Sequence, residues 1–584
     1  MFNKIKSINY FKLAEIILNI IFLFITLAGV GVSIYMNLVN RSLWLDEAML
    51  AYSFSKRSLL ELTSAPLEWM QSAPVGWLYL LKIVTLIFGN TEIVLRSVSI
   101  FGFILTLFLS YFISRKYLNF RYPLAGCAFL ASMEIMLQYS NIFKPYITDC
   151  AFVLLVFIIF KMYEEHRINL ALLCILWSAL IWFSNPVCFF EGGLLIASFF
   201  LNLLENKTPV KSLIKTHLIL LSCILVSFII YYFYWLRPVA ALGSDMQAYW
   251  DGQQFPLIPT SISDLKLAKR LINAIINPLS TYKTVIFISV VMGLFISISK
   301  RSTLVIGLYL GILVSLFASF ISMYPISPRL WLFIYPVLIL LFLYSIKHLM
   351  NDNVHILAVG LIVVILCLQN NGLEKYSIEE NIYWNNEETR QQVEWLNSNL
   401  SENDSVYVFY STVPGLLYAN NYNESTIGQT NKLYLGTTFF NYDYNYHTDL
   451  AFIENSDTCY IVLSHYNNER ITEMINSLHH SGSLELIYND YSTPIYHYYS
   501  DAADSLSNYE IEIFTDERHN TIRIRNTGAT ILNHDYENMY LMYNEMPYAL
   551  PKLMSPGSYV DITLPGNCIL DSGNLSVVSS ELYL

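Results

Sequence analysis

The sequence has little charge for its length and no strongly basic region. Only 14% of its 584 residues are Asp, Glu, Lys or Arg, whereas 55% are hydrophobic. Most of the chain is therefore too apolar to fold as a water-soluble globule around one core. The formal net charge is -11, but the excess carboxylates lie mainly beyond residue 370, in one polar segment. A nucleic-acid partner is not expected from this charge balance.

Cysteine is scarce and shows no recognisable pattern. Eight cysteines are present, six in or beside apolar segments and two in the polar C-terminal part. No CxxC pair and no cysteine–histidine spacing typical of a zinc site occurs. The sequence therefore gives no support for a disulfide framework or a structural zinc ion.

Long apolar runs are what the chain has instead. A bilayer core about 30 Å thick needs roughly 20 apolar residues per helix. Eleven segments fit this template: 15–38, 94–114, 122–139, 146–163, 168–184, 187–204, 214–235, 283–299, 302–322, 330–346 and 354–370. Neighbouring short spans have possible break points at Pro145, Pro186 and Pro336. Lysines precede the first segment without a small-residue cleavage site, which predicts a retained signal anchor.

Basic residues predict the orientation of these spans. Short cytoplasmic loops carry an excess of Lys and Arg, and a cytoplasmic N-terminus places such residues at every inner turn. They are Arg115, Lys116 and Arg121; Lys161 and Arg167; Lys207, Lys211 and Lys215; Lys300 and Arg301; and Lys347. An odd number of spans then predicts that everything after residue 370 lies outside the cytoplasm.

The sequence predicts three domains. Residues 1–370 form a polytopic α-helical membrane domain with long outer loops at 39–93 and 236–282. Residues 371–504 form an α/β domain, with helices expected at 387–396 and 468–478 and strands at 406–410 and 460–464. Residues 505–584 form a β-sandwich-like module with strands at 510–514, 521–525, 540–543 and 559–564.

The same topology collects the charged residues of the membrane half near its outer face. The acids are Asp46, Glu47, Glu134, Asp149 and Glu191, and the cations are Lys144, Arg237 and Arg329. Charge at this depth is costly unless it is used. A polar cavity open to the outer side is therefore expected.

Sugar transfer from a lipid-linked phosphate fits this set of groups. The phosphate leaving group needs cations to hold its charge, whereas the acceptor hydroxyl needs a base. One carboxylate suffices for an inverting displacement, in contrast with the two that hydrolyse a glycoside. Asp46 or Glu47 supplies the base, cations surround the phosphate, and apolar grooves between spans hold the prenyl chain.

Several segments, in order along the chain, resemble one enzyme group. They are Trp44–Ala48, Ser72–Tyr79, Phe88–Arg96, Tyr139–Tyr146 together with Asp149, and Tyr324–Arg329. This set is similar to the GT-C superfamily, in the branch of polyprenyl-phosphate sugar transferases that includes protein O-mannosyltransferases and the aminoarabinose transferases acting on lipid A. The resemblance covers roughly residues 15–350.

The resemblance implies a role for several residues. Asp46 is the implied catalytic base, Lys144 and Arg329 the implied donor-phosphate contacts, and Asp149 a supporting acid. Asn185 and Pro186 stand where many relatives have a histidine. This difference puts a metal-assisted mechanism in doubt, so no cofactor is certain and a divalent metal stays open.

Simpler structural roles stand beside these. Asp46 and Glu47 suit the first turn of a helix. Lys144 and Asp149 lie five positions apart and suit a structural ion pair. Arg329 precedes an apolar helix, where its side chain suits snorkelling to lipid headgroups. Glu134 and Glu191 fit hydrogen-bonded structural carboxyls, and His465 fits a satisfied loop histidine.

The sequence thus predicts a multi-pass, bacterial-type plasma-membrane glycosyltransferase of the cell envelope. Its predicted partners are a polyprenyl-phosphate-linked sugar, an extracytoplasmic glycan, lipid or protein acceptor, and the lipid bilayer. A transporter or flippase is the main alternative, but transporters usually bind substrate near the bilayer midplane and often have repeated halves. A non-catalytic assembly or sensing protein is a third alternative.

Overall fold

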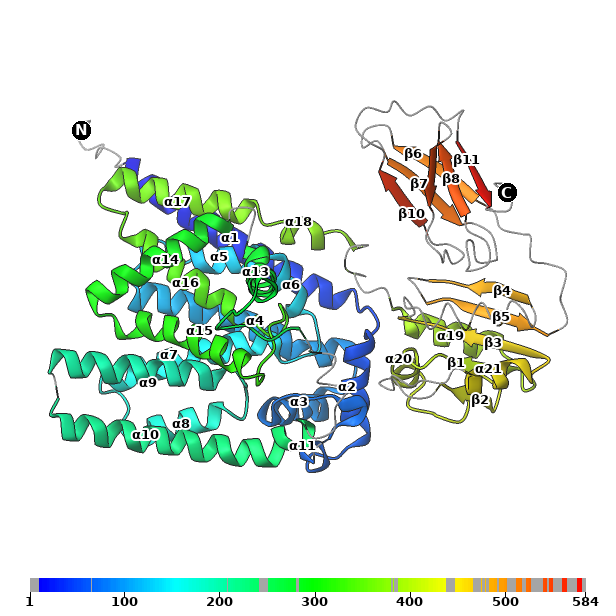
Figure 1. Cartoon of the computed structure of the whole chain (residues 1–584), viewed down its shortest axis with the longest axis horizontal. Helices are drawn as coiled ribbons and strands as arrows, with labels where there is room; N and C mark the ends of the chain where they lie inside the picture. Colours follow the sequence, from blue (N-terminus) through cyan, green and yellow to red (C-terminus); the bar gives the residue numbers. More distant parts are fainter. Residues whose placement is uncertain are drawn as a thin grey trace, which may run out of the picture. The chain divides into compact units, whose positions relative to one another are not determined.

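The chain forms two compact units, one of which is discontinuous in sequence (Figure 1). The computed structural model describes residues 10–64, 66–206, 208–240, 250, 252–279, 283–379, 382, 387–436, 447–465, 474, 478, 483–490 and 493–500, and six further strands nearer the C-terminus. One unit comprises Met1–Arg41 and Ser53–Trp384, and the other comprises Ser42–Tyr52 and Asn385–Leu584. A short piece of the first predicted outer loop is therefore grouped with the C-terminal region.

The first unit is a helical bundle. Within the described residues, seven helices are long and apolar enough to cross a membrane. They are α1 (Tyr10–Leu38), α4 (Glu92–Phe112) with its extension η3 (Ile113–Tyr117), α7 (Tyr146–Glu164), α9 (Val187–Glu205), α10 (Val210–Tyr231) with its extension η4 (Tyr232–Leu236), α14 (Lys283–Lys300) and α15 (Thr303–Phe320). Shorter apolar helices are α3 (Val75–Phe88), α8 (Leu170–Leu180), α16 (Ile334–Lys347) and α17 (Asn353–Leu368).

The predicted helical membrane fold is confirmed. Ten of the predicted spans correspond to long or short apolar helices, and the remaining span, 122–139, corresponds to two short helices, α5 (Ala125–Ser132) and α6 (Glu134–Ser140). Met133 between them has an extended backbone. Pro145 and Pro186 directly precede α7 and α9, where a missing backbone N–H costs little because the first N–H groups of a helix have no partner inside it.

Small residues allow two of the long helices to approach closely. A Cβ on Gly193 of α9 would lie 2.4 Å from the backbone N of Gly311 in α15. A Cβ on Gly311 would lie 2.3 Å from the Phe190 ring, and one on Gly307 2.5 Å from Leu194. Small residues at such positions are the usual means of packing apolar helices in lipid, where van der Waals contact replaces hydrophobic driving force. They hold α9 and α15 together.

Charged residues of the predicted cytoplasmic turns meet at one end of the bundle. Lys116, just after α4, forms an ion pair with Glu165 at the end of α7 at 2.7 Å. Arg121 pairs with Glu15 near the start of α1, also at 2.7 Å. These contacts join three segments that the basic-residue pattern assigns to the same side.

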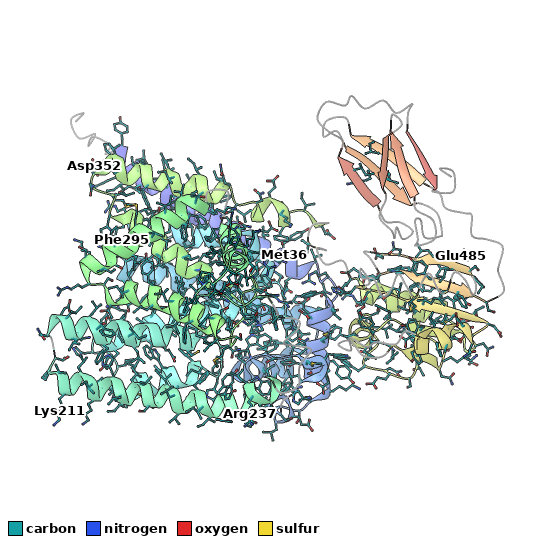
Figure 2. All side chains as sticks on the ribbon, viewed as in Figure 1. Met36, Lys211, Arg237, Phe295, Asp352 and Glu485 are labelled. Carbon is teal, nitrogen blue, oxygen red and sulfur yellow. The ribbon has the colours of Figure 1, made fainter. Side chains whose placement is uncertain are left out.

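Figure 2 shows the two ends of the bundle through labelled side chains. Lys211, at the start of α10, and Asp352, directly before α17, lie toward one end, whereas Arg237 and Met36 lie toward the other. Each pair joins residues that the predicted topology assigns to one membrane side.

Short helices fill the loops of this bundle. They include η1 (Glu61–Thr63), η2 (Glu68–Met70), α11 (Arg237–Ala240), α13 (Ile262–Ile276), η5 (Asn277–Leu279) and α18 (Gly372–Tyr376). The helix α2 (Leu45–Lys56) begins among residues of the second unit and ends among those of the first.

The second unit contains a five-stranded mixed sheet, drawn in yellow and orange in Figure 1. Its strands are β1 (Ser405–Val408), β2 (Lys432–Leu435), β3 (Thr458–Val462), β4 (Ser483–Tyr488) and β5 (Ile495–Tyr499), in the order β2-β1-β3-β5-β4. The strand β1 is parallel to both neighbours, and β5 is antiparallel to both of its own. The helices α19 (Thr389–Asn399), α20 (Val413–Ala419) and α21 (His447–Glu454) accompany the sheet.

The predicted secondary structure of this region agrees with the described residues. The strands expected at 406–410 and 460–464 correspond to β1 and β3. The helix expected at 468–478 falls outside the described residues, apart from Met474 and Leu478, which are buried in the core of the sheet with Tyr407, Ile461 and Tyr496.

Two three-stranded antiparallel sheets follow. One has the order β10-β7-β6 and the other β11-β8-β9. The strands are β6 (Ile511–Asp516), β7 (Thr521–Asn526), β8 (Met539–Tyr543), β9 (Met546–Ala549), β10 (Tyr559–Thr563) and β11 (Leu575–Ser579). All four strands predicted beyond residue 505 are among them.

Candidate active site

The two acids of the first outer loop occupy the first turn of α2, where they have different environments. The carbonyl of Trp44 accepts hydrogen bonds from the backbone N–H groups of Glu47 and Ala48, both at 2.9 Å. The Glu47 carboxylate accepts in return from the Trp44 N–H at 3.3 Å, as the third helical residue does in a capping box. Glu47 is fully buried, whereas Asp46 is partly exposed. Glu47 thus closes the helix end, and Asp46 is the acid that solvent reaches.

Two carboxylates of the second unit hold the backbone that leads into α2. Glu388 accepts hydrogen bonds from the backbone N–H of Ser42 at 3.0 Å and from the Ser42 hydroxyl at 2.9 Å. Glu387 accepts from the backbone N–H of Leu45 at 2.7 Å. Both carboxylates are buried, at 6% and 2% exposure for Glu387 and Glu388, so their charges depend on these donors.

His465 completes this group of residues. Its Nδ1 donates to Glu387 Oε1 at 2.5 Å, while the imidazole itself is half exposed. The backbone of His465 has a φ of +52°, a conformation that residues other than glycine seldom adopt. The hydrogen bond to Glu387 raises the pKa of His465, burial opposes it, and the charges of Glu387 and Asp46 raise it further. Asp46 therefore lies within electrostatic reach of the imidazole.

Lys144 is buried in the first unit. It lies in the loop between α6 and α7, is 4% exposed, and donates from Nζ to Gln71 Oε1 at 2.5 Å. Gln71 follows Trp69 and Met70, whose φ values of +49° and +52° place two consecutive bulky residues in the left-handed region. Strained backbone of this kind persists where the surrounding structure enforces it and often marks a functional loop. The structure thus joins Lys144 to the long outer loop 39–93.

Asp149 and Tyr324, the first residue of the predicted segment Tyr324–Arg329, lie within electrostatic reach of each other in the first unit. Asp149 is buried in the first turn of α7. Burial raises the pKa of Tyr324 well above its usual value, and the charge of Asp149 is the next cause. The Tyr324 hydroxyl donates to the carbonyl of Leu330 at 2.9 Å, which closes this loop on itself. The guanidinium of Arg329 lies 5.4 Å from the centre of the Trp250 ring.

The remaining predicted charges have separate surroundings. Arg237 is exposed at the end of η4 and lies over the Phe233 ring at 5.5 Å; among the described residues it forms no ion pair with another predicted site residue. Glu134 pairs with Lys375 at 2.7 Å. Glu191 is fully buried in α9, and its oxygens have no hydrogen-bond partner within the described part of the chain.

An apolar cavity of about 670 Å³ opens on the first unit. Its lining comprises Thr63, Val75, Gly76, Tyr79, Leu80, Ile83, Trp182, Phe183, Ile230 and Tyr234. The backbone N–H of Gly76 donates to the carbonyl of Trp182 at 2.7 Å, and a Cβ on Gly76 would lie 2.7 Å from the Phe183 ring. The close approach of α3 to the end of α8 that shapes this cavity therefore requires glycine at position 76.

The described residues contain no group of three or more His, Cys, Asp or Glu side chains placed to hold a metal ion. Asn185, noted above for the absence of a histidine, accepts a hydrogen bond from the Tyr231 hydroxyl at 2.9 Å. Its amide thus serves the packing of α9 against α10.

The sequence pattern did not identify Gln71, Glu387 or Glu388 as part of a site. Glu387 was expected to begin a helix, but α19 starts at Thr389. The physical reason is that both carboxylates face Ser42 and Leu45 rather than the helix. Two adjacent acids directly before a helix were the available signal.

The helical bundle and the mixed sheet have counterparts among solved structures. No family model and no curated protein matches this sequence. Among solved structures, ArnT from Cupriavidus metallidurans, a GT-C glycosyltransferase, is similar in its apo state, with a TM-score of 0.52 and 10% identity, over 82% of this chain and 98% of that one. A second structure of ArnT, bound to undecaprenyl phosphate, has a TM-score of 0.47 and 10% identity, over 82% and 97%. The chain is thus a multi-pass membrane protein with an ArnT-like architecture.

Proposed function

We propose that this protein is a membrane glycosyltransferase that moves a sugar from a polyprenyl-phosphate donor to an acceptor outside the cytoplasm. The observation that carries the proposal is the partly exposed Asp46 in the first turn of α2, within an ArnT-like fold. Glu47 beside it is buried and hydrogen-bonded to the helix end. Asp46 is therefore the better placed of the two acids to meet an acceptor hydroxyl.

The proposed reaction is an inverting displacement. The acceptor oxygen attacks the anomeric carbon while its proton passes to the Asp46 carboxylate. The bond between that carbon and the phosphate oxygen breaks, and the polyprenyl phosphate leaves with the electron pair. Lys144 and Arg329 stabilise the charge that develops on the phosphate. No general acid is needed, because the leaving phosphate is a weak base.

The apolar cavity supports a lipid-linked donor. Its volume of about 670 Å³ lies within the usual range of roughly 300–1,000 Å³ for ligand pockets. Its lining is almost wholly apolar, and three hydroxyls meet there: Tyr79 and Tyr234 both contact Thr63, at 3.4 Å and 3.2 Å. Such a surface suits an isoprenoid tail better than a sugar.

The decisive experiment compares donor turnover by the purified protein and by Asp46→Asn, using a panel of polyprenyl-phosphate sugars. Asparagine keeps the shape of the side chain and loses the base, so transfer should fall by about 10²–10⁴-fold. Asp352→Asn is the matched control, because Asp352 caps α17 and asparagine caps a helix about as well. Undiminished transfer by Asp46→Asn would remove this residue from the mechanism.

The buried carboxyl of Glu191 supports a second candidate function, transport of a substrate across the membrane. It is a fully buried carboxyl within a membrane-type helix, and such residues often line transport paths. Movement of labelled lipid-linked sugar across vesicles, without transfer to any acceptor and abolished by Glu191→Gln, would favour that function instead.

A further inference from the structure

The segment that carries Asp46 is attached to the second unit along its whole length. Its beginning is held by Glu388 and Glu387, as described above. Further along, the Tyr52 hydroxyl donates to Glu424 at 2.7 Å, and the Tyr422 hydroxyl donates to the carbonyl of Ala51 at 3.3 Å. The rings of Tyr52 and Tyr422 meet edge to face, with centroids 5.6 Å apart. Residues 42–52 are therefore fixed by side chains that lie more than 340 residues later in the chain.

We propose that Glu387 is a positioning residue for Asp46, held in place by His465, so that the second unit is part of the catalytic apparatus. The inference rests on the proposed function. Its geometric basis is that one Glu387 oxygen accepts from the backbone N–H of Leu45, directly before Asp46, and the other accepts from His465 Nδ1.

The two hydrogen bonds of Glu387 depend on each other. A buried carboxylate is stable only when its oxygens are paired, and here each oxygen has one described donor. Removing His465 leaves Oε1 without that donor and loosens the hold on Leu45. The backbone N–H of Leu45 fixes the place from which the Asp46 side chain projects. A shift of 1 Å in a reacting group costs about 10²-fold in rate.

The charge of Asp46 also acts on the imidazole. Because Nδ1 donates to Glu387, Nε2 is the ring nitrogen that takes no part in this hydrogen bond. The two acids whose charges act on His465 are Glu387, just before α19, and Asp46 on α2. His465 is thus hydrogen-bonded to the carboxylate that holds the helix and lies within electrostatic reach of the proposed base.

The test uses the full chain in nanodiscs and four variants. Glu387→Gln should lower kcat by about 10–100-fold with little change in KM for the donor, and should speed hydrogen exchange of residues 42–52. Glu402→Gln is the matched control, because Glu402 is an exposed acid of the same unit, and it should match the parent. His465→Ala should behave as Glu387→Gln does. His465→Asn, whose amide replaces the Nδ1–H donor, should restore kcat. It should also remove from the pH dependence of kcat the ionisation that belongs to the imidazole.

The two proposals fail in different ways. Parent-like kcat and exchange in Glu387→Gln, with Asp46→Asn inactive, would overturn the positioning role and leave the proposed function intact. Full activity of Asp46→Asn would overturn the proposed function and, with it, the need to position Asp46. Failure of His465→Asn to recover activity over His465→Ala would show that the donor to Glu387 is not what His465 contributes.

Discussion

Glu387 accepts a hydrogen bond from the backbone N–H of Leu45, at 2.7 Å and across 342 positions of sequence. This single contact fixes where the first turn of α2 starts relative to the mixed sheet. It connects the acidic motif after the first apolar segment to a residue of the predicted α/β domain.

Stability of the second unit should fall as pH rises above neutrality. Glu387 and Asp46 raise the pKa of His465 in the folded protein, so the protonated imidazole stabilises the folded state. That contribution is complete below the ordinary histidine pKa of about 6.5 and disappears as pH passes the raised folded-state value. The effect should stay below about 1 kcal/mol because the side chain is half exposed. Melting temperatures measured from pH 5.5 to 8.5 check this, and His465→Asn should remove the trend.

Lys144→Met should weaken donor binding. Lys144 is a buried cation hydrogen-bonded to Gln71, and loss of a charged hydrogen bond costs about 1.5–3 kcal/mol, or roughly 10–100-fold in affinity. Titration of the protein with polyprenyl phosphate measures the change. Lys215→Met removes an exposed lysine of α10 and serves as the control. Equal affinity of both variants for polyprenyl phosphate would show that Lys144 does not bind the phosphate.

Gly76→Val should close the apolar cavity. A Cβ at this position already meets the Phe183 ring at 2.7 Å, so a larger side chain fills the wall between α3 and the end of α8 or displaces it. Affinity for long-chain polyprenyl phosphate should drop by about tenfold or more, whereas a short water-soluble analogue should bind as before. Gly192→Ala, where an added Cβ meets no atom within 4 Å, is the control. Equal losses for long and short donors would argue against a lipid-tail site.

Labelling in intact cells tests the proposed sidedness. A cysteine at Glu402, in a Cys568→Ser background, should react with a membrane-impermeant maleimide from outside. A cysteine at Lys211, at the opposite end of α10 from Arg237 (Figure 2), should react only after permeabilisation. The described native cysteines are buried or partly buried, which keeps background labelling low. The reverse pattern would invert the topology and place Asp46 in the cytoplasm.

The helical fold was predictable because its determinants are local. Apolar runs of bilayer length and prolines at helix starts are written in consecutive residues, and α7 and α9 begin where Pro145 and Pro186 indicate. The break at Met133 was not predictable. Asn370 donates to the Ser132 hydroxyl at 2.8 Å, so the residues around the break contact a segment far along the chain.

The candidate site was predictable only in part. Asp46 stands out because two acids follow a long apolar run, a pattern visible within ten residues. Glu387 does not, because its role depends on Ser42 and Leu45 being brought to it by the fold. The same holds for His465, which looks like an ordinary loop histidine until its Nδ1 is seen on Glu387. Hydrophobic periodicity and composition do not predict hydrogen bonds between residues far apart in the sequence, such as those of Glu387 with Leu45 and His465.

The discontinuous second unit has a practical consequence for chimeras. An exchange of soluble domains between related proteins that cuts only near residue 384 would leave Ser42–Tyr52 facing a foreign surface, without Glu387, Glu388, Tyr422 and Glu424 to receive it. The unit to be exchanged therefore has two pieces. A chimera should take the eleven residues Ser42–Tyr52 from the same protein as the C-terminal region that binds them.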